Sequence, residues 1–174
     1  GERDDIHDWL ALLRAPGIGN RRCLKLLAEF ASPAKLFEAD ADHLRSIGLP
    51  PESIDYLNNP DWQAVERDLE WFAQSGNSII TWHNPAYPLL LKEIPDPPAL
   101  LFVHGDPDYL CQPQLAIVGS RNPSAGGRAN AFEFSAFLSR CGLLITSGLA
   151  LEQINEALAP DPSWVRDMRY LPSF

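Results

Sequence analysis

The first 76 residues carry apolar side chains at helical spacing. Residues 6–14 place theirs on one helix face, and the turn 16–19 ends that segment. Asn20 is expected to cap the next helix, and Ser32-Pro33 has the composition of a helix start. The pattern therefore predicts a bundle of short helices over residues 6–14, 21–30, 33 onwards and 61–75.

Beyond residue 76 the pattern changes to short apolar runs that are typical of strands. The run 115–119 is continuously apolar, as in a parallel strand that is buried on both faces. A helix over 126–141 and a strand over 143–146 would complete a βαβ unit, and therefore a Rossmann-like parallel sheet. Two further strands are predicted, over 78–82 and 100–104, with a short helix over 89–93. The expected class is α/β, with a helical domain over 1–76 and a Rossmann-like domain over 77–174.

The charge distribution changes the expectation about ligands. The chain of 174 residues has a net charge of −9, which counts against binding of nucleic acids. Within residues 111–150, however, the only charged side chains are Arg121, Arg128, Arg140 and Glu133, so the net charge of this stretch is positive. An acidic protein with one basic region can still bind a polyanion there.

Composition also sets expectations about compartment and metals. No apolar run is long enough to span a bilayer, and residues 1–5 lack the features of a signal peptide. The three cysteines are scattered along the chain, so a disulfide framework is not expected. The histidines lack the spacing of metal ligands, so a metal site is not expected either. We expect a cytoplasmic protein without membrane contact.

The strongest chemical feature is the segment from Ile117 to Arg128, where the predicted strand passes into its helix. Gly119 permits a tight turn and a close approach of a ligand, Ser120 offers a hydroxyl, and Arg121 offers a planar guanidinium for a phosphate. Arg128 lies in the first turn of the predicted helix, where a cation opposes the dipole unless an anion is bound nearby. Ser147-Gly148 ends the next strand, beside this corner.

The segment predicts a phosphate-sized pocket, although an inert turn remains the alternative. It lacks the spacing GxGxxG of dinucleotide sites and the spacing GxxxxGK[ST] of P-loops. No nucleotide cofactor is therefore expected.

A second candidate is the turn Pro16-Gly17-Ile18-Gly19, which is followed by Arg21. It resembles a helix-hairpin-helix motif, in which backbone amides of a glycine turn contact a DNA phosphate. The preferred interpretation is a tight turn in a sterile-alpha-motif-like helical domain, because this domain holds 14 acidic residues. Gly17, Gly19 and Arg21 are therefore an auxiliary DNA contact at most.

Several motifs together resemble those of the DNA-processing protein A (DprA/Smf) family. They occur in the family's order and with its spacing, and the resemblance covers residues 6–150. The motifs are Tyr87–Leu90, Ile94–Pro98, Leu101–Asp106, Leu115–Arg121 and Ile145–Ala150.

The resemblance implies a function in recombination without a catalytic step. Such a protein binds single-stranded DNA, forms a homodimer and helps to load the RecA recombinase on incoming DNA during natural transformation. Carried over to this sequence, the family's phosphate pocket consists of Gly119, Ser120, Arg121, Ser147 and Gly148. Arg128 is added to it by the dipole argument.

The resemblance ends near Ala150. Residues 151–159 predict a short helix, and residues 160–174 are rich in proline and predict no buried strand, so the predicted sheet is incomplete. Truncation, a foreign tail and a junction of non-adjacent segments are all open interpretations, and they leave dimerisation of this form in doubt. Two other functions also stay open. One is a nucleoside-monophosphate phosphoribohydrolase, although the Pro-Gly-Gly-x-Gly-Thr loop of that family is absent from this sequence. The other is a protein-interaction module whose helical domain binds a partner through its acidic face.

Overall fold

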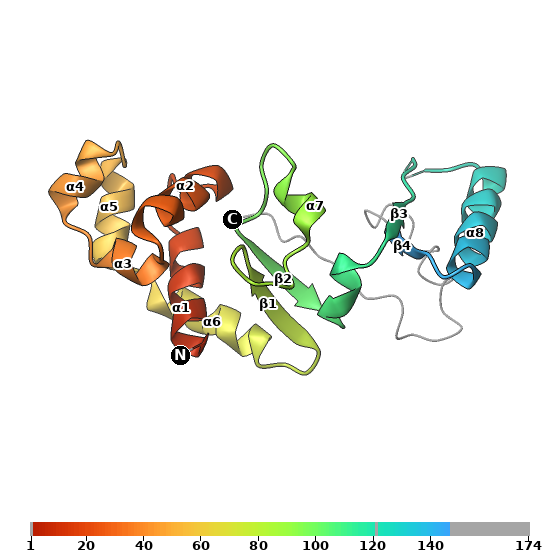
Figure 1. Cartoon of the computed structure of the whole chain (residues 1–174), viewed down its shortest axis with the longest axis horizontal. Coiled ribbons are helices and arrows are strands. Elements are labelled where there is room, and N and C mark those ends of the chain that lie inside the picture. Colours follow the sequence, from red (N-terminus) through yellow and green to blue (C-terminus); the bar gives the residue numbers. More distant parts are fainter. Residues whose placement is uncertain (1, 121, 147–174) are drawn as a thin grey trace. The chain divides into compact units, whose positions relative to one another are not determined.

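The computed structural model describes residues 2–120 and 122–146 (Figure 1). These residues divide into two compact units, a first unit that ends at Val103 and a second unit that begins at His104. The domain boundary expected after residue 76 stays a prediction. Each unit is described by itself below.

The first unit contains short helices and two strands, and the last of these helices lies between the strands in the chain. The helices are α1 (Glu2–Leu13), α2 (Asn20–Phe30), α3 (Pro33–Phe37), α4 (Ala41–Ser46), α5 (Pro51–Asn58), α6 (Trp62–Phe72) and α7 (Leu89–Lys92). Strands β1 (Asn77–Thr81) and β2 (Leu100–His104) form a two-stranded sheet. The predicted bundle is therefore present, and α5 is an additional helix that we did not expect.

Local capping explains where most of these helices begin. The Ser32 hydroxyl accepts from the amide of Lys35, and Pro33 follows it at the first helical position, as predicted. Asp40 and Asp61 cap α4 and α6 in the same way. Helix α5 begins at Pro51, where the missing amide of proline costs nothing.

The expected capping role of Asn20 is wrong. Gly19 is the N-cap of α2 and supplies no side chain, whereas Asn20 is the first residue of the helix. The Asn20 side-chain oxygen instead accepts from the backbone amide of Ala99, at 3.2 Å. The Asn20 side-chain oxygen, which was expected to accept from an amide at the start of α2, therefore accepts from an amide 79 residues away.

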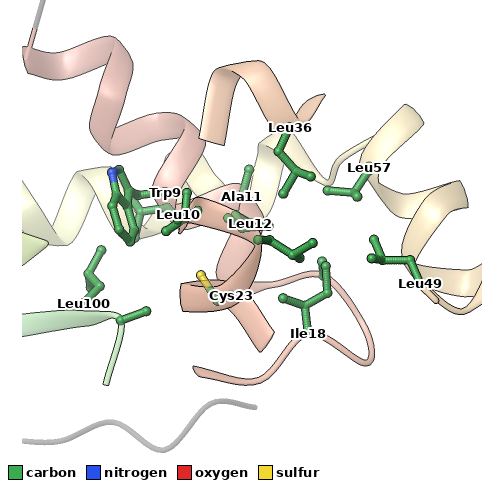
Figure 2. Packing of buried hydrophobic residues seen from close by; sticks show 14 of the residues in the cluster. Trp9, Leu10, Ala11, Leu12, Ile18, Cys23, Leu36, Leu49, Leu57 and Leu100 are labelled. Carbon is green, nitrogen blue, oxygen red and sulfur yellow. The ribbon is translucent and has the colours of Figure 1, made fainter. Parts of the chain in front are cut away.

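The first unit has one continuous apolar core, part of which is seen in Figure 2. Trp9, Leu10 and Leu12 of α1 lie at its centre, and Ile79 and Leu100 bring both strands into it. Its other buried members are Ala11, Ala15, Ile18, Cys23, Leu26, Leu27, Leu36, Leu44, Leu49, Ile54, Leu57, Val65 and Ala99. The helices and the β1–β2 sheet are thus packed into one unit.

Polar contacts fix two positions around this core. The guanidinium of Arg14 donates to both carboxylate oxygens of Asp68, at 2.8 and 2.9 Å, and joins the end of α1 to α6. This contact raises the pKa of Arg14. The buried Tyr87 donates its hydroxyl to the carbonyl of Pro98, at 2.7 Å, and so closes the proline-rich segment between β1 and β2.

The second unit places a helix between two parallel strands in the chain. A 3₁₀ helix, η1 (Pro107–Cys111), precedes β3 (Gln114–Ala116), and α8 (Ala125–Arg140) leads to β4 (Leu144–Thr146). Strands β3 and β4 pair in parallel, with Gln114 opposite Leu144 and Ala116 opposite Thr146. This is the predicted βαβ unit, and α8 lies within one residue of its expected bounds.

The expectation that residues 115–119 form a strand buried on both faces is wrong for the described part of the chain. Strand β3 is only three residues long and exposed, and the Val118 side chain after it is 85% exposed. Within the described residues β3 pairs only with β4, so its apolar side chains lack the neighbours that a central strand has. Helix α8 likewise exposes Phe132, Phe134 and Phe137.

The helices of the described part are too short or too polar to cross a bilayer.

The core predicts a clear difference between two leucine substitutions in the first unit. Leu36 is fully buried, so Leu36→Ala should lower the free energy of unfolding by about 2–5 kcal/mol. Leu90 is 78% exposed, so Leu90→Ala should change it by less than about 0.5 kcal/mol. Denaturant unfolding of both variants measures the difference, and equal losses would show that Leu36 is not part of the core.

Candidate functional site

The parallel pairing brings the ends of β3 and β4 together. Beyond the last paired residues, the backbone amide of Ile117 donates to the carbonyl of Thr146, at 2.9 Å. The chain therefore leaves both strands at the same edge of the sheet. In parallel sheets this carboxyl edge is where ligands bind.

The loop after β3 presents a glycine and a serine at this edge. Gly119 and Ser120 are both exposed, and the Ser120 hydroxyl accepts from the amide of Asn122, at 3.1 Å. The described residues place no atom within 4 Å of a Cβ added at Gly119. Gly119 is not among the glycines with positive φ, so its backbone conformation does not itself require a glycine. Its roles in a tight turn and in the close approach of a ligand stay predictions.

Helix α8 begins directly after this loop and is capped by Ser124. The Ser124 hydroxyl accepts from the amide of Gly127, at 3.1 Å. A Cβ at Gly127 would lie 3.2 Å from this hydroxyl oxygen, which favours glycine at this position. The amides of Ala125 and Gly126 have no partner among the residues that the structure describes. Two donors and the positive end of a helix of 16 residues therefore stand where the loop ends.

Arg128 is the fourth residue of α8, one place beyond the amides at the helix start. Its side chain is exposed, and no acidic residue lies in the first turn of this helix. The helix ends at Arg140, where a cation instead favours the dipole. Arg128 and Arg140 thus carry the same charge, but Arg128 lies near the positive end of the helix dipole and Arg140 lies at its negative end.

The remaining predicted pocket residues, Arg121, Ser147 and Gly148, lie outside the described residues. Thr146 is the last described residue before Ser147. The structure therefore brings Gly119, Ser120 and Arg128 onto one βαβ unit and leaves the other three as predictions.

Sequence reasoning did not single out Gln114 or Thr146, whose side chains bond to each other at this edge. The two residues are 32 positions apart. A polar residue at the start of a strand gives no local signal for such a contact, and only the register of β3 against β4 shows it.

In the auxiliary candidate, the turn 16–19, Gly17 has a structural explanation. Its φ is +71°, and an added Cβ would lie 3.2 Å from both the Pro50 and the Ser53 side chains. The Ser53 hydroxyl donates to the carbonyl of Pro16, and the Arg22 guanidinium donates to the carbonyl of Gly17 at 3.0 Å. The fold of the first unit therefore requires this glycine whether or not DNA binds.

Gly19 and Arg21 differ from Gly17. The described residues place nothing within 4 Å of a Cβ at Gly19, and the Arg21 side chain is exposed. They stand at the start of α2, which has no acidic residue in its first turn. Both are placed where a phosphate has access.

The described histidine, cysteine and acidic side chains form no cluster that could hold a metal ion. Cys23 lies in the core of the first unit, and burial raises the pKa of its thiol to about 12. A thiol with such a pKa is protonated at neutral pH and unreactive as a nucleophile.

Comparison with known proteins identifies the region that contains this site. The family model for DNA recombination-mediator protein A matches residues 78–152. The chain is 39% identical over 87 residues to the DNA processing protein DprA of Bacillus subtilis, covering 49% of this chain and 29% of that protein. It is 34% identical over 146 residues to the protein Smf of Escherichia coli, covering 84% of this chain and 38% of that protein.

A solved structure extends the likeness to the fold. The X-ray structure of DNA processing protein A from Streptococcus pneumoniae superposes with a TM-score of 0.63 and 25% sequence identity, covering 87% of this chain and 52% of that one. The expected α/β class, with a helical part followed by a Rossmann-like parallel pair, is confirmed. The chain spans about a third of the length of the two curated relatives. It belongs to the DNA-processing protein A (DprA/Smf) family.

Proposed function

We propose that this chain binds single-stranded DNA at the carboxyl edge of the β3–β4 pair, as part of a recombination mediator. The family model supports this proposal, because residues 78–152 include every residue of the predicted pocket. The bound groups are backbone phosphates, held by the loop after β3, the start of α8, and Ser147-Gly148.

The observation that carries the proposal is the geometry of the described half of the pocket. The Ile117–Thr146 hydrogen bond joins the two strand ends, and the amides of Ala125 and Gly126, which have no partner among the described residues, lie at the positive end of α8. Gly119, in the loop between β3 and α8, has open space where a side chain would stand. Backbone amides at a helix start, an exposed glycine and an arginine are the groups that bind phosphates in other proteins.

The chemistry of these groups favours binding without catalysis. The described pocket residues are a glycine, a serine and an arginine, and none is paired with a carboxylate or an imidazole that would act as a general base. Phosphate contacts carry no base sequence, so binding should depend on salt and only weakly on sequence.

The partners proposed for the whole protein are RecA recombinase and a second copy of the chain. Family membership supports both of them. Phe134 and Phe137 of α8, which are exposed and three residues apart on one side of the helix, also favour a protein contact, because monomeric proteins rarely expose large apolar side chains together. The turn at Gly17, Gly19 and Arg21 is proposed as an auxiliary contact for the same DNA backbone.

The two arginines of α8 provide a matched test of the phosphate site. Arg128→Ala should weaken binding of a fluorescent oligo-dT about three- to tenfold and reduce the slope of log K against log salt by about 0.7, the loss of one phosphate contact. Arg140→Ala removes the same charge from the other end of the helix and should leave the slope unchanged. Arg121→Ala should abolish most of the binding.

Two results would contradict the proposal, one from the salt series and one from an activity assay. Equal effects of Arg128→Ala and Arg140→Ala would show that net charge, not the pocket, determines affinity. Hydrolysis of a nucleoside monophosphate by the chain would replace the binding function with an enzymatic one.

Gly119→Ala tests the close approach of the ligand. The added methyl group meets no described atom within 4 Å, so the free energy of unfolding should change by less than about 0.5 kcal/mol. The same methyl group should weaken oligo-dT binding at least about threefold, because it occupies the space through which the proposed phosphate approaches the loop after β3. A variant that binds as tightly as the unchanged chain would place the phosphate elsewhere.

A further inference from the structure

The side chain of Gln114 joins three elements of the second unit. Its Nε2 donates to the carbonyl of Tyr109, at 2.8 Å, and to the carbonyl of Leu110, at 3.3 Å. Its Oε1 accepts from the Thr146 hydroxyl. The 3₁₀ helix η1, strand β3 and strand β4 therefore meet at one amide group.

The register of the sheet explains how Gln114 reaches Thr146. Gln114 lies opposite Leu144, and Thr146 lies two residues further along β4. Side chains two residues apart on a strand share a face, so Gln114 and Thr146 are on the same face of the pair. The long Gln114 side chain runs along this face, from the start of β3 to the end of β4.

The hydrogen-bonding groups determine the orientation of the amide. The two carbonyls of η1 can only accept, so the NH₂ group of Gln114 must face them. Its oxygen is thereby directed to Thr146, whose hydroxyl can donate. Glutamine is the side chain that supplies both groups with this reach.

Thr146 occupies a decisive place in the proposed site. Its carbonyl accepts from the amide of Ile117, the contact that joins the two strand ends. Its side chain is the one that Gln114 holds. The next residue along the chain is Ser147, a predicted phosphate ligand.

We propose that Gln114 is a positioning residue, which fixes the end of β4 at Thr146 beside the end of β3 and so sets the edge at which the phosphate site is proposed. Gln114 does not itself touch the DNA. The importance of this alignment for DNA binding rests on the proposed function, whereas the alignment itself does not. A hydrogen bond of this kind contributes modestly to global stability, so its effect should be local.

The first experiment measures hydrogen exchange of the Ile117 amide. Gln114→Met keeps the length of the side chain and removes all three hydrogen bonds, and should speed Ile117 exchange about two- to tenfold. The matched control is Gln112→Met, since Gln112 is exposed and its side chain bonds to no described residue. That variant should exchange like the unchanged chain.

Two substitutions at Thr146 isolate one bond of the network. Thr146→Val keeps the shape and removes the hydroxyl, and should speed Ile117 exchange by a similar factor. Thr146→Ser restores the hydroxyl and should restore slow exchange. A general loss of packing would instead affect Thr146→Ser as well, and would lower the unfolding midpoint.

Binding of oligo-dT gives the second readout. Gln114→Met and Thr146→Val should weaken it about two- to tenfold with an unchanged salt slope, because no phosphate contact is removed. Unchanged Ile117 exchange in both variants would overturn the positioning role, even if the chain binds DNA. Faster Ile117 exchange in a chain that binds no oligo-dT would support the positioning role and contradict the proposed function.

Discussion

The hydrogen bond from the Ile117 amide to the Thr146 carbonyl is the contact on which the candidate site depends. It continues the parallel pairing of β3 and β4 beyond Ala116 and holds the carboxyl ends of both strands at one edge. Without it, the glycine and serine after β3 would have no fixed relation to the end of β4. The start of α8 follows the loop after β3 and adds amides that have no partner among the described residues, so the candidate site relies mainly on backbone groups.

The two units differ in how they are stabilised. The first unit buries a continuous apolar cluster from α1 to β2 and adds the Arg14–Asp68 pair and the Asn20–Ala99 hydrogen bond. In the described part of the second unit, large apolar side chains of β3 and α8 are exposed, and side-chain hydrogen bonds of Gln114 and Ser124 define the local geometry. Polar contacts therefore have more influence on the geometry of the candidate site than on that of the helical core.

The sequence was informative where short-range signals decide the structure. Ser32-Pro33 correctly predicted the start of α3, and the apolar pattern located α8. Long-range contacts were not predictable in this way, because short-range signals do not show which distant residues meet. The Asn20 side chain bonds to Ala99, and Gln114 bonds to Thr146. Helix α5 was missed, although Pro51 stands at its first position, where proline is favourable. The candidate loop and the parallel strands beside it were predicted from the sequence, but the register of β3 against β4 and the Gln114–Thr146 contact were not.

The measurement that tests the central claim most directly is NMR titration of the labelled chain with oligo-dT at low and high salt. The account predicts shifts of the Gly119, Ser120, Ala125 and Gly126 amides that saturate at low salt and disappear at high salt. The core amides of Leu10 and Leu36 should not shift. Shifts confined to the helices of the first unit, or no shifts at any salt concentration, would contradict a phosphate site at the β3–β4 edge.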